Sequence, residues 1–417
     1  MAQTYKFGNG TWATKKGSTL AYNDEDNNFK PLPFSFERNS IATRVNKEGL
    51  IEVVGNDIPR IDYTDSSEGA LLLENSSTNL ITYSEDFSNA AWTKNNSSVT
   101  SGFTSPDGTT NAFKLIEDTS STTEHRVYVS MTSSVSTYSI RAKVGERSWI
   151  YIVAGGLGAY FDLENGIIGT SNTNANIKAL SNGWYECSIL TAVLNGSTAN
   201  IMIAKGNGLE VYTGDGTSGV YIYGAMLESN SFSTSYIPTS GSTVQRAAET
   251  CNESGNSEVF NDSQGVLFAD MAALSNDLTN RFISLTDGSN DNRVLFGYRA
   301  SSNQVFARIE GNNSASVDLT NVVSDTEIVI KLAIYYDSSF NYKMYLNGFL
   351  VDNAIGTDSI IGLDRFDFTN AAGTENFYGK TKEIAYYDTA LTDEELEYMT
   401  SYRSLNEMVT ELNLNAL

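Results

Sequence analysis

The chain has 417 residues, of which 40% are hydrophobic and 11% aromatic, so it is long enough for two or three domains with substantial cores. Its 50 acidic residues outnumber its 27 Lys and Arg, and the net charge of −23 disfavours binding to the phosphates of nucleic acids. No apolar run is long enough to predict a membrane helix, and residues 1–20 lack the apolar core of a signal peptide. We therefore expect no nucleic-acid partner, no membrane insertion, and synthesis in a cytoplasm.

Residues 1–82 form a predicted N-terminal anchoring segment. They contain Pro31, Pro33 and Pro59, three of the five prolines of the chain, and only short apolar pieces such as residues 50–55. A segment of this kind has too little apolar surface to bury a core of its own. We expect it to lie extended along another subunit or along the first sandwich.

A seam is predicted within residues 69–94. Residues 69–73 form a short apolar strand, and residues 74–78 are Asn- and Ser-rich turn residues. Apolar residues then return, and Phe87 and Trp92 flank a polar turn. This pattern indicates that the anchoring segment ends here and that a β-sandwich begins at about residue 83.

Two blocks of short strands follow, separated by polar residues. Alternating apolar runs between Asn, Ser, Thr and Gly turns are typical of antiparallel sandwiches. The first block, residues 83–246, and the second, residues 263–390, are each predicted to be a sandwich, with residues 247–262 as a linker. The expected strands are residues 126–131, 138–144, 149–154, 184–190, 199–204 and 219–227 in the first block, and 265–272, 281–287, 293–300, 304–310, 327–337, 342–351 and 381–388 in the second.

The last segment, residues 391–417, is predicted to contain one α-helix. Thr392 and Glu395 have the spacing of a capping box, in which each side chain accepts a hydrogen bond from a backbone N–H of the first turn. Apolar residues follow at steps of three and four: Leu396, Met399, Tyr402, Leu405, Val409 and Leu412. This stripe indicates a helix folded back onto its own sandwich, with a short oligomerising coil as the alternative. The fold class is therefore all-β, with two jelly-roll or β-sandwich domains, an extended N-terminal segment and a C-terminal α-helix.

Several stretches resemble known families. Residues 34–63 and 69–94 resemble the N-terminal region of structural proteins of tailed bacteriophages, fibre proteins especially, and residues 224–249 resemble the closing strand of their carbohydrate-binding-module-like sandwich. Residues 5–40 are similar to fibre proteins of phages that infect Bacteroidetes, including the crAss-like group. Residues 263–400 resemble a concanavalin A-like, laminin-G-type jelly roll.

The phage resemblance implies a location in the virion, as a head or tail fibre or a capsid decoration protein. It also implies a homotrimer that contacts capsid, portal or tail proteins and attaches to a glycan on the host surface. A polysaccharide depolymerase and a host-encoded glycan-binding lectin remain the alternatives.

Catalytic motifs are sparse in this chain. His125 is the single histidine, and the alternation around it predicts a strand-edge residue with no nucleophile nearby. Jelly-roll glucanases place their carboxylates on one strand as Glu-x-Asp-x-x-Glu, and no Glu of this chain has an Asp two positions later. We expect a protein that is not an enzyme.

Sugar binding is predicted from aromatic residues near turns, since lectins stack an exposed ring on the apolar face of a pyranose. The candidates are Trp92, Trp149, Tyr212 and Tyr298. Trp149 and Trp184 lie within expected strands, where a core position is the alternative. Trp92 follows a turn, and Tyr212 precedes a Gly-rich loop in which we expect it to be exposed.

A metal is implied only by the family resemblance. Sandwiches of this kind often hold a structural Ca²⁺ between their opening and closing strands, with carboxylate and carbonyl ligands. In this chain the corresponding candidates are Glu85, Asp86, Asp107 and Glu228, and a solvated acidic surface without a metal is the alternative. No other cofactor is expected.

Overall fold

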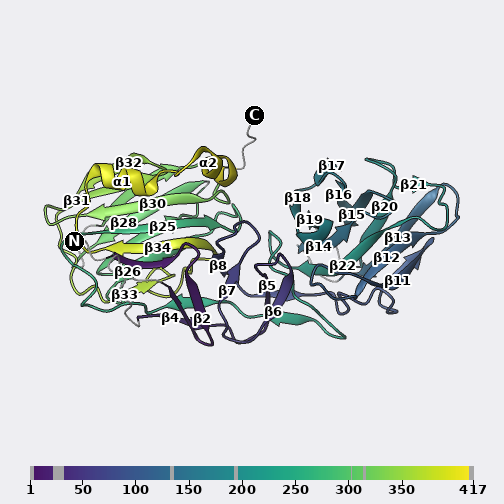
Figure 1. Ribbon diagram of the computed structural model, residues 1–417, viewed down its shortest axis with the longest axis horizontal. Helices are drawn as coiled ribbons and strands as arrows, with labels where there is room; N and C mark the ends of the chain where they lie inside the picture. Colours follow the sequence, from purple (N-terminus) through teal and green to yellow (C-terminus); the bar gives the residue numbers. More distant parts are fainter. Residues whose placement is uncertain are drawn as a thin grey trace. The chain divides into compact units, whose positions relative to one another are not determined.

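A computed structural model describes residues 4–21, 32–131, 136–191, 196–301, 303–312 and 316–412. Within these ranges the chain is almost entirely β, and both of its α-helices lie near the C-terminus (Figure 1). The chain divides into two compact units. Unit 1 comprises Met1–Asn39, Gly55–Asn75 and Ala248–Leu417, and unit 2 comprises Ser40–Val54 and Ser76–Ala247. Neither helix is both long and apolar enough to cross a membrane.

Unit 1 is a sandwich of antiparallel sheets. Its first sheet runs in the order β32 (Phe349–Ile355), β31 (Asn341–Leu346), β30 (Ile330–Tyr336), β25 (Gly265–Ala273), β34 (Gly379–Tyr387), β8 (Ala70–Leu73) and β7 (Arg60–Asp62), with β1 (Thr4–Gly8) also on β34. Its second sheet runs in the order β29 (Val317–Val322), β28 (Gln304–Glu310), β27 (Arg293–Tyr298), β26 (Arg281–Thr286) and β33 (Arg365–Asp367). A smaller sheet contains β2 (Trp12–Lys15), β3 (Ser18–Ala21), β4 (Phe34–Glu37) and β24 (Thr250–Asn252).

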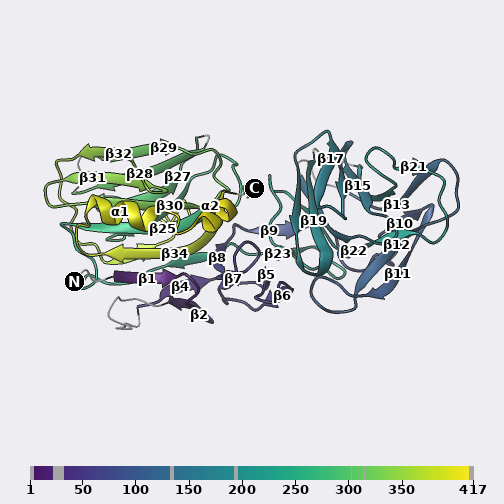
Figure 2. The same cartoon turned by 45° about the horizontal axis from the view of Figure 1, so that its top comes forward.

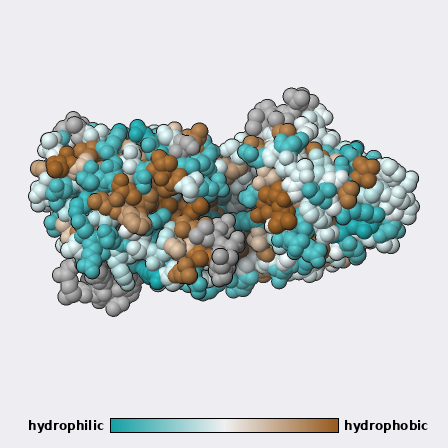
Figure 3. All heavy atoms as spheres, turned by 90° about the horizontal axis from the view of Figure 1, so that it is seen from above, coloured by the Kyte–Doolittle hydropathy of each residue, from teal (hydrophilic) through white to brown (hydrophobic). Residues whose placement is uncertain are grey.

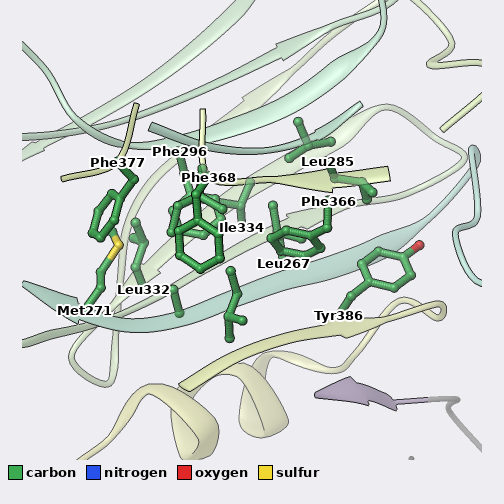
Figure 4. Packing of buried hydrophobic residues seen from close by; sticks show 14 of the residues in the cluster. Leu267, Met271, Leu285, Phe296, Leu332, Ile334, Phe366, Phe368, Phe377 and Tyr386 are labelled. Atoms are coloured by element: carbon green, nitrogen blue, oxygen red, sulfur yellow. The ribbon is translucent and has the colours of Figure 1, made fainter. Parts of the chain in front are cut away.

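The core of unit 1 lies between the two large sheets. Leu267 and Met271 on β25 alternate with outward residues, and Phe296 on β27 meets them from the opposite sheet (Figure 4). Aromatic residues between β33 and β34, such as Phe368 and Phe377, complete the core. The alternation that predicted the strands therefore also selects which side chains are buried.

The C-terminal segment forms two short helices where a single one was expected. Helix α1 (Asp393–Thr400) begins with the predicted Thr392–Glu395 capping box, and helix α2 (Leu405–Glu411) has Ser404 as its own cap. Between them Ser401 adopts an extended conformation, and its hydroxyl donates a hydrogen bond to the Glu397 carbonyl. The expected apolar stripe consequently ends early, because Leu405 is exposed.

The helices cover the outer face of the first sheet. Leu396 of α1 is buried against Phe268 and Tyr345, whereas α2 lies over charged residues of β30, β25 and β34 (Figure 1). The two helices thus fold back on their own sandwich. Residues 413–417, part of the segment expected to be helical, lie outside the described residues, as does Pro31.

The N-terminal 82 residues contribute strands to both units. Strand β1 pairs with β34 in unit 1 (Figure 2), and β7 and β8 extend the same sheet. Phe7 and Phe34 are buried in the core of unit 1. In unit 2, residues 42–54 form a hairpin of β5 (Ala42–Val45) and β6 (Ile51–Val54). Much of this segment is therefore integral to the sandwiches, because its apolar side chains complete their cores.

Unit 2 is a second antiparallel sandwich. One sheet runs in the order β10 (Thr93–Asn95), β13 (Thr123–Ser130), β20 (Thr198–Ala204), β15 (Trp149–Ala154), β16 (Leu157–Asp162) and β17 (Ile167–Ser171), with β21 (Val211–Tyr212) also on β13. The other runs in the order β11 (Ser97–Phe103), β12 (Ala112–Glu117), β22 (Gly219–Glu228), β14 (Ser136–Lys143), β19 (Trp184–Thr191) and β18 (Ala175–Ala179). A 3-10 turn (Ser181–Gly183) precedes β19.

The core of unit 2 is formed by the inward residues of both sheets. Val127, Ile150 and Ile201 come from one sheet, and Ile140 and Ile189 from the other. A short pair of strands, β9 (Ser77–Asn79) and β23 (Val244–Arg246), lies where the chain enters and leaves the unit. The residues expected as a linker, 247–262, include β24, which pairs with β4 in unit 1.

Candidate functional site

Three of the four predicted sugar-stacking residues are buried. Trp92 and Tyr298 are each 1% exposed, and the Trp92 indole donates a hydrogen bond to the Tyr83 carbonyl, 2.8 Å away. Tyr212, expected to be exposed, is 9% exposed, and its hydroxyl donates to the buried Glu117 carboxylate at 2.7 Å. A ring packed into a core offers no free face for a pyranose, so these three expectations were wrong. These residues were selected because they lie near turns in the sequence, and that position alone does not make a side chain exposed.

Trp149, the fourth candidate, lies on an outward-facing surface of unit 2. It opens β15, in which Trp149, Tyr151 and Val153 point outward while Ile150, Ile152 and Ala154 are buried in the core. Its indole ring lies against Gly169 of β17, where a Cβ atom would come within 2.7 Å of the ring. The missing side chain lets the ring lie flat along the sheet and remain half-buried.

Tyr151 forms the centre of this surface. Its ring is stacked on that of Tyr160, with centroids 4.3 Å apart and planes 16° apart. Register places them side by side, because β15 and β16 are joined by the two residues Gly155 and Gly156, both with positive φ. Such two-residue turns fix the pairing of a hairpin. Gly158 leaves room for the Tyr151 ring, since a Cβ there would lie 2.7 Å from it.

The next strands extend the surface with a further aromatic ring and several polar groups. Met202 of β20 lies between Tyr151 and Arg126 of β13, and Asn200 of β20 lies beside Tyr128. Arg126 packs over the Tyr128 ring at 5.3 Å. We call this surface the tyrosine face and define it by the following residues: Glu124, Arg126, Tyr128, Trp149, Tyr151, Tyr160, Asn200 and Glu210.

Two carboxylates set the electrostatics of the tyrosine face. Glu210 accepts a hydrogen bond from the Tyr160 hydroxyl, and Glu124 lies 2.9 Å from Arg126. Burial raises the pKa of the Tyr151 hydroxyl, and the negative charges of Glu210 and Glu124 raise it further. Burial and the Glu210 charge also raise the pKa of Tyr160, so Tyr151 and Tyr160 remain neutral hydrogen-bonding groups at physiological pH.

Two polar atoms of the tyrosine face have no hydrogen-bond partner among the residues that the structure describes. They are the side-chain oxygen of Asn200 and the Nε of Arg126, and both atoms are removed from solvent. Asn200 is only 5% exposed, and its amide nitrogen is fully engaged, with contacts of 3.0–3.3 Å to Val153 and Thr198. Buried polar groups are normally paired. One acceptor and one donor are thus unpaired just beneath a surface lined with aromatic rings.

The structure brings together two of the four predicted metal ligands. The Tyr223 hydroxyl lies 3.1 Å from a Glu85 oxygen and 3.0 Å from an Asp107 oxygen. Burial raises the pKa of Glu85, and the nearby Asp107 charge adds to this effect. Burial would also raise the pKa of Asp107, but hydrogen bonds from Ser105 and Thr109 hold it below its usual value.

The other two predicted ligands are engaged elsewhere. Asp86 caps a turn through Ser88, and the buried Glu228 accepts hydrogen bonds from Ser77 and Thr234. Among the described residues, no group of three or more His, Cys, Asp and Glu side chains is arranged to hold a metal ion. Glu85 and Asp107 supply two of the carboxylates predicted for a Ca²⁺ site, and a complete shell of about six to eight oxygens would need carbonyl or water ligands as well.

His125 is a buried residue and not the expected strand-edge residue. It is 0% exposed, and β13 has neighbouring strands on both sides, β10 and β20. Its Nδ1 lies 2.7 Å from the Asn96 carbonyl, and its ring packs against Tyr212. The side chain points into the sandwich, so the single histidine belongs to the interior of unit 2.

Sequence reasoning missed most of the tyrosine face. Tyr128, Tyr151 and Tyr160 were not singled out, although Tyr128 and Tyr151 alternate with core residues in expected strands. The strand that carries Tyr160, β16, was not expected. The usable signal was an outward aromatic residue on each of several strands. What the sequence lacked was the order of the strands, which places β13, β20, β15 and β16 next to one another.

Residues 271–397 match the family described as the concanavalin A-like lectin/glucanases superfamily, of laminin G type, over less than half of the chain. This confirms a concanavalin A-like sandwich in unit 1. No curated protein matches the chain.

Several solved structures have a similar fold. The IT-sialidase CBM40 of Ruminococcus gnavus, bound to α2,6-sialyllactose, is 15% identical with a TM-score of 0.29, covering 34% of this chain and 85% of its own. The binding domain of botulinum neurotoxin serotype G is 18% identical with a TM-score of 0.29, covering 36% and 39%. The SAP-like pentraxin of Limulus polyphemus is 12% identical with a TM-score of 0.28, covering 34% and 71%. At these values nothing follows about ligand or activity.

Proposed function

We propose that this chain is a non-enzymatic structural protein of a bacteriophage virion that attaches to glycans on the host surface. The phage assignment is supported by the resemblance of residues 34–63, 69–94 and 224–249 to structural proteins of tailed phages, fibre proteins especially. Glycan attachment is supported by the concanavalin A-like match in unit 1. Its location is a head or tail fibre, or a decoration of the capsid.

The observation that carries glycan binding is the tyrosine face of unit 2. Half-buried aromatic rings at Tyr128, Trp149 and Tyr151 lie beside polar groups on adjacent strands. Rings stack on the C–H faces of sugars, and polar side chains orient the hydroxyls, as in other mainly preformed ligand sites.

Self-association would multiply a weak contact of this kind. Exposed apolar side chains support it: Phe349 is 72% exposed on β32, and Leu405 of α2 is also exposed. Figure 3 shows hydrophobic side chains gathered between hydrophilic ones on the face of unit 1 that carries α1 and α2. A homotrimer bound to capsid, portal or tail proteins would convert weak sugar binding into avidity.

The test uses the intact protein and intact particles. We expect antibodies to this chain to label purified infectious particles, and the oligomer to bind host polysaccharide on a glycan array. Absence of the chain from particles would contradict the virion assignment, and absence of binding on the array would contradict glycan attachment.

Two alternatives lead to different results. A polysaccharide depolymerase would release oligosaccharides from host capsule, which we do not expect. A host-encoded lectin would bind glycans but would not be found in purified particles.

A further inference from the structure

We propose that the tyrosine face is the glycan site of this protein and that it selects uncharged sugars over acidic ones. This inference rests on the proposed function, since it names the ligand class and the location of glycan binding. The location is the outer face of the β13–β20–β15–β16 sheet in unit 2, and not the concanavalin A-like sandwich.

The rings provide a platform that spans three strands. Tyr128 on β13, and Trp149 and Tyr151 on β15, are half-buried, so each is fixed by packing yet retains accessible surface. Tyr160 on the neighbouring strand β16 supports one face of the Tyr151 ring, with ring centroids 4.3 Å apart. Rings that are already fixed in place lose little conformational freedom on binding.

The two unpaired hydrogen-bonding groups match a sugar hydroxyl or acetamide in chemistry, and a ligand reaches them after a shift of the side chains that cover them. The Asn200 oxygen needs a donor and the Arg126 Nε needs an acceptor. A hydroxyl group can donate and accept, and an acetamide carries one N–H and one carbonyl. An aliphatic or purely aromatic ligand would leave both atoms unpaired, which is unfavourable in a site removed from water.

The charges of the tyrosine face disfavour an acidic sugar. Its charged groups are Glu124, Arg126 and Glu210. Arg126 is already paired with Glu124, and within the part of the chain that the structure describes no Lys or Arg forms an ion pair with Glu210. A sialic or uronic carboxylate would therefore meet a net negative surface on a chain with a net charge of −23. Uncharged sugars avoid this repulsion.

The experiment measures binding to the full chain by calorimetry. The neutral probes are hexasaccharides of glucose, mannose and N-acetylglucosamine, and the acidic probes are oligogalacturonate and sialyllactose. We expect at least one neutral probe to bind, and Tyr151→Ala to weaken that binding at least tenfold. Y398A, which removes an exposed ring on α1, is the matched control and should bind as the wild type does. Tyr151→Phe keeps the ring and should retain binding, which separates loss of stacking from misfolding.

The charge argument has its own variants. E124Q and E210Q together should raise the affinity for acidic probes relative to the affinity for neutral probes, because both substitutions remove negative charge from the tyrosine face. Tighter binding of an acidic probe than of every neutral probe, lost in Y151A, would overturn the ligand class. Neutral binding that is unchanged in Y151A would overturn the location while leaving the proposed function intact. No binding of any probe or host polysaccharide would overturn both.

Discussion

Asp270 shows how one buried carboxylate shapes the stability of unit 1. It lies on the outer face of β25, opposite Lys331 of β30 and Glu383 of β34, beneath helix α2. Lys331 and Lys382 are already paired with Glu407 and Glu411 of α2. One Asp270 oxygen has no hydrogen-bond partner within the described ranges, and burial raises the pKa of this residue to about 7.

We predict that Asp270→Asn removes a pH dependence of stability. Because the folded pKa of about 7 exceeds the ordinary value of 3.8, only the folded state holds this proton between those pH values. The wild type should therefore lose stability as the pH rises from about 4 to about 7, by up to about 4 kcal/mol from this group. Urea unfolding of both proteins across this range measures the difference.

Glu394, an exposed acid in the first turn of α1, provides the control for this experiment. E394Q should keep the same pH profile as the wild type. If D270N and the wild type lose stability in parallel as the pH rises, Asp270 is ionised in the folded protein at acidic pH and the explanation fails.

The sequence predicts the burial of a residue when that residue alternates with apolar residues in a strand. It does not predict the burial of residues in loops. Tyr151 alternates with core residues, so its outward direction follows from its own strand. Trp92 was judged by its distance from a turn, and it is buried because Phe87 and Phe113 of unit 2 pack around it. A side chain in a loop is placed by tertiary contacts, which a local pattern does not contain.

At the scale of elements, a buried ion cluster joins three separate segments of unit 1. Glu249 accepts hydrogen bonds from Arg38 at 2.8 Å and from Arg60, and Arg60 also pairs with Glu74 at 2.8 Å. All four side chains are buried. Arg38 comes from the first segment of the unit, Arg60 and Glu74 from the second, and Glu249 from the third.

We predict that Glu249→Gln destabilises the chain by about 3–5 kcal/mol, the usual cost of removing one partner from a buried ion pair. The amide keeps the volume but removes the negative charge that both arginines contact. Urea unfolding measures this loss of stability. The control is E258Q, at an exposed position nine residues further along the chain, which should change the free energy of unfolding by less than about 0.5 kcal/mol. A small loss in E249Q would mean that water or another acid compensates the arginines.

The helical segment shows what local signals can and cannot provide. The capping box at Thr392 predicted the start of α1. Ser404 and Glu407 have the same Ser-x-x-Glu spacing, and the Ser404 hydroxyl accepts a hydrogen bond from the Glu407 N–H at 3.0 Å. The start of α2 could thus have been predicted from the sequence, but the apolar residues at steps of three and four favoured one continuous helix.

For the whole molecule, the all-β class and both sandwiches could be predicted, while the assembly of each unit from separate segments could not. Residues 40–54 and 76–247 form one unit, and the intervening residues 55–75 belong to the other. Strand periodicity carries no information about partners distant in sequence, such as β1 with β34. The seam within residues 69–94 does coincide with a change of unit, after Asn75.

The place of the N-terminal residues in the core leads to a prediction for Phe34. Its ring is fully buried, 4.7 Å from Phe7 and 5.2 Å from Phe368. Phe34→Ala should therefore destabilise the chain by about 3–5 kcal/mol in urea unfolding. I355A, at an exposed position on β32, is the control. If residues 1–39 served only to anchor the protein to its neighbours, F34A would leave the stability of the isolated chain unchanged.

Binding of a glycan to unit 2 should stabilise unit 2 without stabilising unit 1. A ligand that binds only the folded form of unit 2 adds about 2.7 kcal/mol to its stability at a hundred times the dissociation constant. Hydrogen exchange of the slowest amides in β15 and β20 should then slow about a hundredfold, since such amides exchange only through unfolding. Amides of β25 and β30 in unit 1 should keep their rates, because each unit has its own core and sheets. Equal slowing in both units would show that the four chain connections make them one cooperative block, and slowing in unit 1 alone would place the glycan on the concanavalin A-like sandwich.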